Sequence, residues 1–256
     1  MSVLCVVGSV WGVTQLHDVV YIVCWKSSKI LRFNATKHQR LRDIVVNGLR
    51  WPWDIVACER TSQLYVADSG KYVWRVSSDG EDIQRWLPNF PDDTFRPWTL
   101  SVTSTRLLVT TLSTRQLREF DSDGVELRRV QLPRDMPPRH AVESPTGTFI
   151  VSRYNQSRDV VEVNTGGKVR RQFSGSRLSS LGYTPHVAID SHGNIFVADR
   201  RNHHILMLDV HLSLRRVIDE HQLNDKRPRR ICDREQSGQL LVGLVGGVAV
   251  FDVLCR

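Results

Sequence analysis

The sequence has no long hydrophobic run and little cysteine. Its longest apolar stretch near the start, from Val3 to Val7, is too short to cross a membrane and lacks the basic lead-in and cleavage site of a secretory signal. The five cysteines form no Cys-x-x-Cys pair, and no histidine stands near them at zinc spacing. We therefore expect a soluble, cytoplasmic protein with buried, reduced thiols and no membrane partner.

Helical periodicity and linkers are absent as well. No stretch of a dozen residues keeps apolar side chains at positions i, i+3, i+4 and i+7. Instead, short apolar runs are bounded by Gly, Asn, Asp or Ser, which is typical of strands and tight turns. No low-complexity segment divides the 256 residues. The sequence predicts a single all-β domain over residues 1–256.

A repeat is present along the whole chain. In five copies of the repeat, a proline stands directly before the first short strand. In the first copy, Val10 before Trp11 takes the same place. We call these six positions the marks. The intervals between these marks are 41 to 47 residues, and the five prolines are Pro52, Pro97, Pro138, Pro185 and Pro228. A period of about 40–50 residues made of short strands is typical of a propeller blade. We predict a six-bladed β-propeller of four-stranded blades.

The ends of the chain predict how the ring closes. The sixth copy stops at Val253 without a fourth strand, while the first copy has an additional strand, Val3 to Val7, in front of it. Pairing these two segments would remove an exposed sheet edge. We expect the N-terminal strand to complete the last blade.

The segment from His186 to Asp209 resembles an NHL repeat. It contains Val-Ala-Ile-Asp-Ser-His-Gly-Asn-Ile-Phe-Val-Ala-Asp followed by Asn-His before the next strand, and a partial match occurs over Leu64–Val76. The chain is therefore similar to the six-bladed NHL propeller at the C-terminus of TRIM-NHL proteins. That resemblance implies a recognition domain for RNA or protein. No RING, B-box or coiled coil precedes it, so ubiquitin-ligase activity is not expected of this chain.

Charge is predicted to differ between the two faces of the propeller. The chain has 35 Lys and Arg against 27 Asp and Glu, a net charge of +8, which favours an acidic or polyanionic partner. Loops between second and third strands share one face with the loops between blades, and these loops are rich in Lys and Arg. We call this the basic face. The loops at the other end, the acidic face, carry Asp18, Glu59, Asp79, Asp121, Glu143, Asp190 and Asp209, among others.

Aromatic residues accompany the predicted basic face. The residues directly after the marks are Trp11, Trp53, Trp98, Arg139, His186 and Arg229, which would form a ring at the channel mouth. Cations interleaved with planar side chains suit single-stranded RNA, and also a peptide with acidic and aromatic anchors. The candidate binding residues are Lys26, Arg50, Trp51, Trp53, Lys71, Tyr72, Arg96, Trp98, Arg115, Arg139, Arg153, Arg158, His186, Arg200, Arg201, His203, Arg229 and Arg230. The alternative is structural: tryptophans packed between blades and a solvated basic rim.

Catalytic and metal-binding motifs are missing. The sequence has no Gly-x-Ser-x-Gly elbow, phosphate-binding loop or zinc-deaminase pattern. Asp54 and Asp190 lack a matching carboxylate in a neighbouring copy, and at most one of His203 and His204 can join His186, because adjacent strand residues point to opposite sides. We expect no metal, no cofactor and no enzymatic activity.

These observations predict a monomeric, non-enzymatic recognition module that binds single-stranded RNA on the basic face. The first alternative is a protein-interaction scaffold, for example one that recruits a substrate for a ubiquitin ligase supplied by another chain. A hydrolase or lyase of the propeller type is a further alternative.

Overall fold

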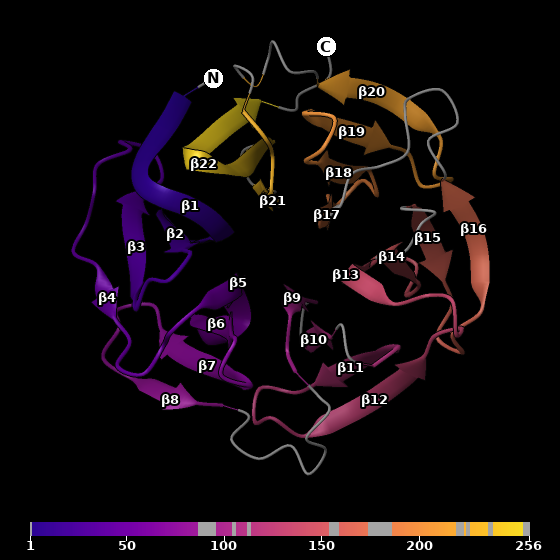
Figure 1. Cartoon of the computed structure of the whole chain (residues 1–256), viewed down its shortest axis with the longest axis horizontal. Coiled ribbons are helices and arrows are strands. Elements are labelled where there is room, and N and C mark those ends of the chain that lie inside the picture. The colour runs from indigo at the N-terminus through magenta and orange to yellow at the C-terminus, as the bar shows by residue number, and fades with distance from the viewer. Residues whose placement is uncertain are drawn as a thin grey trace.

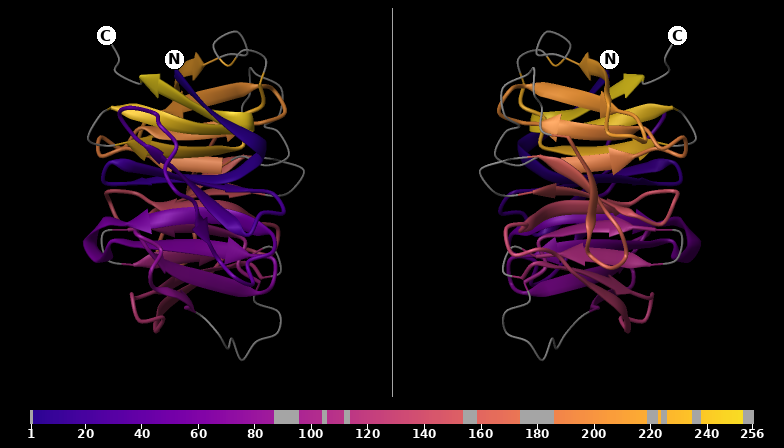
Figure 2. Two further views of the ribbon diagram at one scale, coloured as in Figure 1. Left: turned by 90° about the vertical axis from the view of Figure 1, so that its left-hand side faces the viewer. Right: turned by 90° about the vertical axis from the view of Figure 1, so that its right-hand side faces the viewer.

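The chain folds into five antiparallel sheets arranged around a central axis (Figure 1). The structure, a computed structural model, describes residues 2–86, 96–103, 106–111, 114–153, 159–173, 186–218, 223, 226–234 and 238–252. The side views show strands that run from one face of the ring to the other (Figure 2). Within the described residues, no helix is long and apolar enough to span a membrane.

Four of the sheets have four strands each. The first contains β5 (Pro52–Cys58), β6 (Gln63–Asp68), β7 (Tyr72–Ser77) and β8 (Ile83–Arg85), with a 3-10 turn, Glu59–Thr61, between β5 and β6. The second contains β9 (Thr99–Val102), β10 (Leu107–Thr110), β11 (Gln116–Phe120) and β12 (Glu126–Gln131). The third contains β13 (Pro138–Glu143), β14 (Phe149–Arg153), β15 (Val160–Val163) and β16 (Val169–Phe173). The fourth contains β17 (His186–Ile189), β18 (Ile195–Asp199), β19 (His204–Leu208) and β20 (Leu214–Ile218).

The fifth sheet joins the two ends of the chain. Its six strands are β21 (Arg230–Arg234), β22 (Gln239–Asp252), β1 (Ser2–Leu16), β2 (Val19–Cys24), β3 (Lys29–Asn34) and β4 (Ile44–Val45), in that order. The first part of β1 pairs with β22, from Ser2 opposite Val250 to Cys5 opposite Gly247, and its second part pairs with β2. The N-terminal strand therefore pairs with the last strand, as the repeat pattern predicts.

The predicted number of separate blades is not found. The structure has five sheets, because β1 and β22 both continue through the points where the repeat predicts a break between the last blade and the first. The prediction of a propeller with four-stranded blades is confirmed, whereas six separate blades are not. The innermost strands, which follow one another around the axis, are nevertheless β1, β5, β9, β13, β17 and β21.

Burial explains why the strand types differ in sequence. Second strands such as β6, β10 and β18 are buried along most of their length, so their residues are nearly all apolar. The outer strands β16 and β20 expose their arginine pairs at the rim. The hydrophobic core lies between neighbouring sheets: Tyr65 and Trp86 of one sheet pack with Leu100 and Phe120 of the next.

A repeated turn accounts for several acids of the predicted acidic face. Asp190 Oδ1 accepts hydrogen bonds from the backbone N–H groups of His192 and Asn194, and Gly193 between them has φ of 81°. Three further side chains make the same pair of bonds, namely Asp121, Asn164 and Asp209. An Asp or Asn at this position satisfies the backbone of the turn, so these residues shape the hairpins.

Two substitutions in the same strand test the closure of the ring. Leu4 is 2% exposed and packs in the core, whereas Val7 is 96% exposed. We expect Leu4→Asp to lower the free energy of unfolding by roughly 3 kcal/mol or more, because it buries an unpaired charge. Val7→Asp should change it by less than about 0.5 kcal/mol. Urea denaturation of both variants measures the difference, and equal effects would show that this strand is not part of the packed ring.

Candidate functional site

The tryptophans of the predicted channel mouth pack against one another. Trp53 lies 4.0 Å from Trp98 and 5.0 Å from Trp11 between ring centroids, and Trp11 stacks on Trp25 at 4.7 Å. The row continues to Trp51, whose ring stacks on Trp25 at 5.7 Å. Trp51 is 45% exposed, so it is the tryptophan of this row that offers a large free surface. Most of the predicted stacking platforms are therefore used for packing.

Several predicted cationic binding residues are buried. Arg139 lies over the ring of Trp98 at 4.4 Å, and Arg153 forms an ion pair with Asp159. Arg230 donates from Nη2 to the backbone oxygen of Trp53 at 2.8 Å. All three arginines are less than a tenth exposed.

The other candidates are accessible to different degrees. Tyr72 has its ring under Arg85, at 4.2 Å, and His203 accepts a hydrogen bond from Arg227 Nε at 3.0 Å. Arg158 lies outside the described residues. The exposed candidates are Lys26, Arg50, Arg96, Arg115 and Arg201, and the half-buried ones are Lys71, Tyr72, Arg200, His203 and Arg229.

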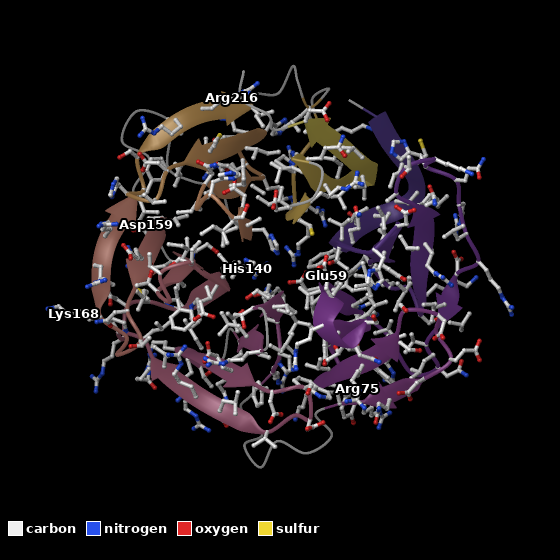
Figure 3. The ribbon with its side chains drawn as sticks, turned by 180° about the vertical axis from the view of Figure 1, so that it is seen from behind. Glu59, Arg75, His140, Asp159, Lys168 and Arg216 are labelled. Atoms are coloured by element: carbon white, nitrogen blue, oxygen red, sulfur yellow. The ribbon has the colours of Figure 1, made fainter. Side chains whose placement is uncertain are left out.

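The main pocket lies at the opposite end of the channel. It has a volume of about 1120 Å³ and is lined by the second halves of the inner strands, for example Asp54 to Cys58 of β5 but not Trp53. Its rim is formed by loops that join first and second strands and includes Asp18, Glu59 and Glu143. Seen from behind, Glu59 and His140 both lie beside the channel (Figure 3). Sequence analysis placed the binding surface on the basic face and missed this pocket.

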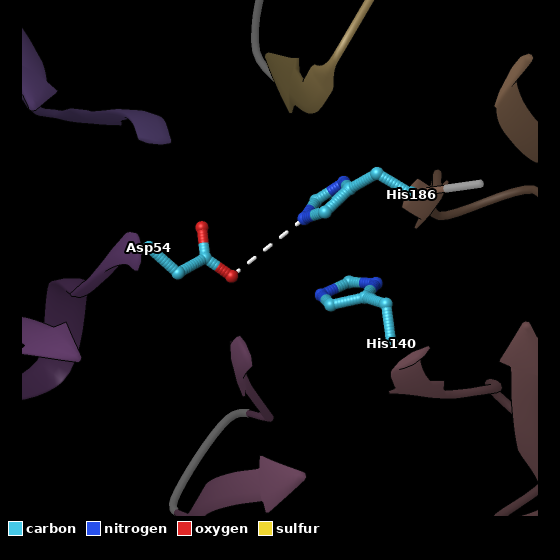
Figure 4. A group of neighbouring side chains, drawn as sticks. All are labelled: Asp54, His140 and His186. Carbon is cyan, nitrogen blue, oxygen red and sulfur yellow. Dashed lines mark ion pairs between the residues drawn. The ribbon is translucent and has the colours of Figure 1, made fainter. Parts of the chain in front are cut away.

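A carboxylate and two histidines converge on the floor of the pocket (Figure 4). Asp54 comes from β5, His140 from β13 and His186 from β17, and one ligand atom of each lies within 4.8 Å of the others. The two imidazole rings stack with centroids 3.7 Å apart. His186 Nε2 faces Asp54 Oδ2 at 3.7 Å. Of the three, sequence analysis selected only His186 as a binding residue.

Asp54 is held by its own strand and by two others, β9 and β21. Its Oδ1 accepts from the N–H of Ile55 at 3.0 Å and its Oδ2 from the N–H of Leu100 at 3.1 Å. Arg230 Nε lies 3.4 Å from Oδ1. Burial raises the pKa of the Asp54 carboxyl, and the positive charge of Arg230 works in the opposite direction. The result is a buried acceptor with one cation beside it.

The hydrogen bonds of the two histidines fix their protonation. The N–H of Val187 donates to His140 Nδ1 at 3.3 Å, and the N–H of Ile231 donates to His186 Nδ1 at 3.4 Å. A neutral imidazole that accepts at Nδ1 carries its proton on Nε2. His140 Nε2 donates this proton to the backbone oxygen of Leu100 at 3.1 Å. Burial lowers the pKa of both rings well below 6.5, so both stay neutral.

This tautomer decides what the cluster can bind. The three side chains are of types that ligate metals, but a metal on Nε2 needs a lone pair where each ring carries a proton. His140 would also lose its bond to Leu100. The arrangement is better suited to hydrogen bonding and proton transfer than to holding a cation.

The sequence contains a pattern for this cluster at the second residue after each mark. The candidate binding residues of the channel mouth were taken from the first residue after each mark. The second residue after each mark is Gly12, Asp54, Thr99, His140, Val187 or Arg230. Register shifts occur between Pro52 and Asp54 and between Pro138 and His140. An additional residue at the start of a strand changes which side chain faces the channel. β17 pairs with β18 without such a shift from His186 onward. There the first residue after the mark, His186, joins the same cluster.

Cys24, Cys58 and Cys232 are buried or half-buried, whereas Cys5 is exposed. Cys24 and Cys58 are buried, and burial raises the pKa of Cys24 and of Cys232 to about 11. Cys232 lines the pocket, but its thiol is protonated at neutral pH.

Comparison with known proteins identifies the fold. No protein-family model matches the chain, and no curated protein matches it. Several solved structures do. A catalytically inactive virginiamycin B lyase from Staphylococcus aureus with quinupristin is 13% identical, with a TM-score of 0.70 over 96% of this chain and 80% of that one. A streptogramin B lyase is 12% identical, with a TM-score of 0.69 over 100% of this chain and 87% of that one. Hydrazine synthase of Kuenenia stuttgartiensis is 14% identical, with a TM-score of 0.67 over 95% of this chain and 83% of that one.

These comparisons correct one prediction. The chain is a β-propeller, and the expectation that it is not an enzyme is wrong, because lyases share its fold over nearly its whole length. That expectation relied on the absence of known catalytic motifs, which are short segments of sequence. The residues of this pocket come from separate strands and therefore form no such segment. The NHL resemblance of residues 186–209 stays a prediction.

Removing the Asp54 carboxylate tests its role in the channel. We expect Asp54→Ala to lower the free energy of unfolding by about 3–5 kcal/mol, because Arg230 is then buried without its counter-charge. Adding Arg230→Met to this variant should restore part of the stability, since the unpaired charge is gone. Urea denaturation of the single and double variants measures both effects. A double variant less stable than Asp54→Ala would contradict the ion-pair explanation.

The two buried imidazoles predict an acid-sensitive fold. Below pH 6.5 the unfolded chain protonates both rings while the folded chain keeps them neutral. The contribution of the two neutral rings to the free energy of unfolding is therefore fully present above pH 6.5. Below that pH the free energy of unfolding should fall by up to about 1.4 kcal/mol per pH unit for each ring. Asp54 acts in the opposite sense at lower pH, because its raised pKa favours the protonated carboxyl in the fold.

Urea denaturation between about pH 7.5 and pH 5.5 measures this slope. His140→Gln and His186→Gln should each remove about half of the contribution of the pair. An unchanged slope in both variants would show that other groups cause the acid sensitivity.

Proposed function

We propose that the pocket is the active site of an enzyme of the lyase or hydrolase type, in which Asp54 acts as a base and His186 as a hydrogen-bond donor. One observation carries this proposal: a buried carboxylate and a neutral imidazole face each other at 3.7 Å on the floor of a pocket of about 1120 Å³. Perturbed titratable groups in a large pocket are typical of catalytic sites. The lyases that share the fold support the same class of reaction.

Asp54 would act as the general base. Its raised pKa makes it a stronger base than an exposed carboxylate, and the N–H groups of Ile55 and Leu100 hold its orientation. The positive charge of Arg230 favours the anionic form of the carboxyl. In a lyase, such a base takes the proton from a carbon next to a carbonyl group, the bond between the neighbouring carbon and its leaving group breaks, and the electron pair forms a carbon–carbon double bond.

His186 would act as a neutral donor. Its Nε2 proton has no hydrogen-bond acceptor within the described residues, and the atom lies beside Asp54. A neutral imidazole with a strongly lowered pKa can donate a hydrogen bond to an oxygen that gains negative charge without losing its proton. His140 stacks on His186 and holds the ring in place.

The pocket favours a ligand larger than a simple metabolite. Its volume is at the upper end of the range for small-molecule sites. The walls include the apolar residues Val13, Val142 and Ile189, while the rim carries charges of both signs, Glu59 and Arg60 among them. A cyclic peptide or a lactone has the carbonyl groups and apolar surface to match. Quinupristin occurs with the similar S. aureus lyase, so it is the first compound to test.

Incubation of the protein with quinupristin or with an uncharged macrocyclic lactone tests the proposal. We expect the wild type to convert one of the two compounds, and chromatography with mass spectrometry measures the conversion. His186→Gln should reduce the rate by about 10²-fold or more, since the donor is lost. Cys232→Ser, a change in the same pocket wall, should retain most of the activity.

The proposal is wrong if neither compound is converted and neither binds in a calorimetric titration. Equal loss in His186→Gln and Cys232→Ser would also contradict it, because the effect would then reflect the pocket wall in general.

We also infer that the six-stranded sheet acts as two blades, which would make six in one domain. β22 pairs with β21 through Gln239–Gly243 and with β1 through residues 245–250, and Gly8 and Gly246, both near the ends of these pairings, have positive φ. The NHL-like motif supports this count. A monomeric state and the cytoplasmic location remain predictions.

A further inference from the structure

Four arginines meet at the end of the channel opposite the pocket. We call Arg200, Arg227, Arg229 and Arg230 the arginine corner. The guanidinium groups of Arg229 and Arg230 lie over the ring of Trp11, at 5.3 and 6.0 Å from its centroid. Arg227 donates to His203 at 3.0 Å. None of these four residues lines the pocket.

The charges of this corner are poorly balanced. Burial and the neighbouring charges of Arg200, Arg230 and Arg227 lower the pKa of Arg229 to about 10. The pKa of Arg200 is lowered by burial and by Arg227. Among the described residues, Arg230 has the carboxylate of Asp54 at 3.4 Å, while the charged groups that act on Arg229 are all arginines. Clustered, partly desolvated cations are destabilising until an anion neutralises them.

An aromatic surface continues from the corner. Trp11 stacks on Trp25, which in turn stacks on Trp51. Trp51 is 45% exposed at the far end of this row. A ligand that reaches from the corner to Trp51 thus meets cations first and an exposed indole last.

We propose that the arginine corner and Trp51 bind an acidic segment of a partner protein, with its carboxylates on Arg200, Arg227 and Arg229 and an aromatic side chain on Trp51. Guanidinium groups bind carboxylates through paired hydrogen bonds, and Arg229 Nε is buried without a hydrogen-bond partner in the described structure. The carboxylate-binding residues Arg200, Arg227 and Arg229 lie at the other end of the inner strands from the pocket, so this proposal does not rest on the proposed enzyme activity, and Arg230 is the member of the corner that also contacts Asp54.

Two features favour a peptide over RNA. The four arginines of the corner lie together, whereas a nucleic-acid strand needs charges distributed along its backbone. The rings of Trp53 and Trp98 lie tilted against each other with centroids 4.0 Å apart, so they do not offer a series of stacking platforms for bases.

Fluorescence anisotropy with the whole protein tests this site. The probe is a fluorescein-labelled peptide, Glu-Glu-Phe-Glu-Glu, with Gln-Gln-Phe-Gln-Gln as the uncharged comparison and a labelled oligouridine of about twelve nucleotides as the nucleic-acid probe. We expect saturable binding of the acidic peptide that weakens at higher salt, and much weaker binding of the other two probes.

Three variants, each of which removes one positive charge, show where on the protein the acidic peptide binds. Arg227→Gln and Arg229→Gln should each weaken binding of the acidic peptide by about tenfold, as expected for a charge-assisted contact. Arg170→Gln, an exposed arginine on the outer strand β16, should weaken it less than about twofold. Thermal unfolding shows whether each variant is folded, and the exposed Arg227 decides the test if Arg229→Gln is not.

Three results would overturn the proposal. Absence of peptide binding at low salt removes the site. Equal weakening in all three variants shows attraction by net charge alone. Tighter binding of the oligouridine than of the peptide assigns the corner to nucleic acid.

Discussion

The centre of the ring depends on the contacts that the buried carboxylate of Asp54 makes with the surrounding strands. It accepts hydrogen bonds from β5 and β9, while Arg230 of β21 and His186 of β17 approach it from across the channel. An ionised group far from water is stable only where donors surround it, so these strands must bring their groups to one point. Arg230 belongs to both ends of the channel, since it contacts Asp54 below and Trp11 above.

The architecture could be predicted from the sequence because it rests on local patterns. The interval between marks, the apolar second strands and the Asp-x-x-Gly turns such as that of Asp190 are all properties of short segments. The pairing of the N-terminal strand with the last strand could also be predicted, since one copy lacked a strand and another had one in excess. The number of sheets could not, because it depends on whether β1 and β22 continue through Gly8 and Gly246.

The candidate site could not be predicted, for two physical reasons. Register shifts at the starts of β5 and β13 bring Asp54 and His140 into the cluster, and such a shift has no sequence signature by itself. The tryptophans that directly follow the marks, Trp11, Trp53 and Trp98, were expected to bind a ligand but pack against one another in edge-on and tilted contacts. Cations are predictable from composition, but whether one is buried depends on neighbours far away in the sequence, as for Arg230 beside Asp54.

The pairing of residues 2–5 with residues 247–250 has a consequence for synthesis of the protein. During translation residues 2–5 are made long before their partners, residues 247–250. The growing chain must therefore keep an unpaired β edge, with Leu4 uncovered, until the ring can be completed. The sheet thus closes through a contact between segments that leave the ribosome far apart in time, and this delay is a period in which a nascent chain is exposed to association with its copies.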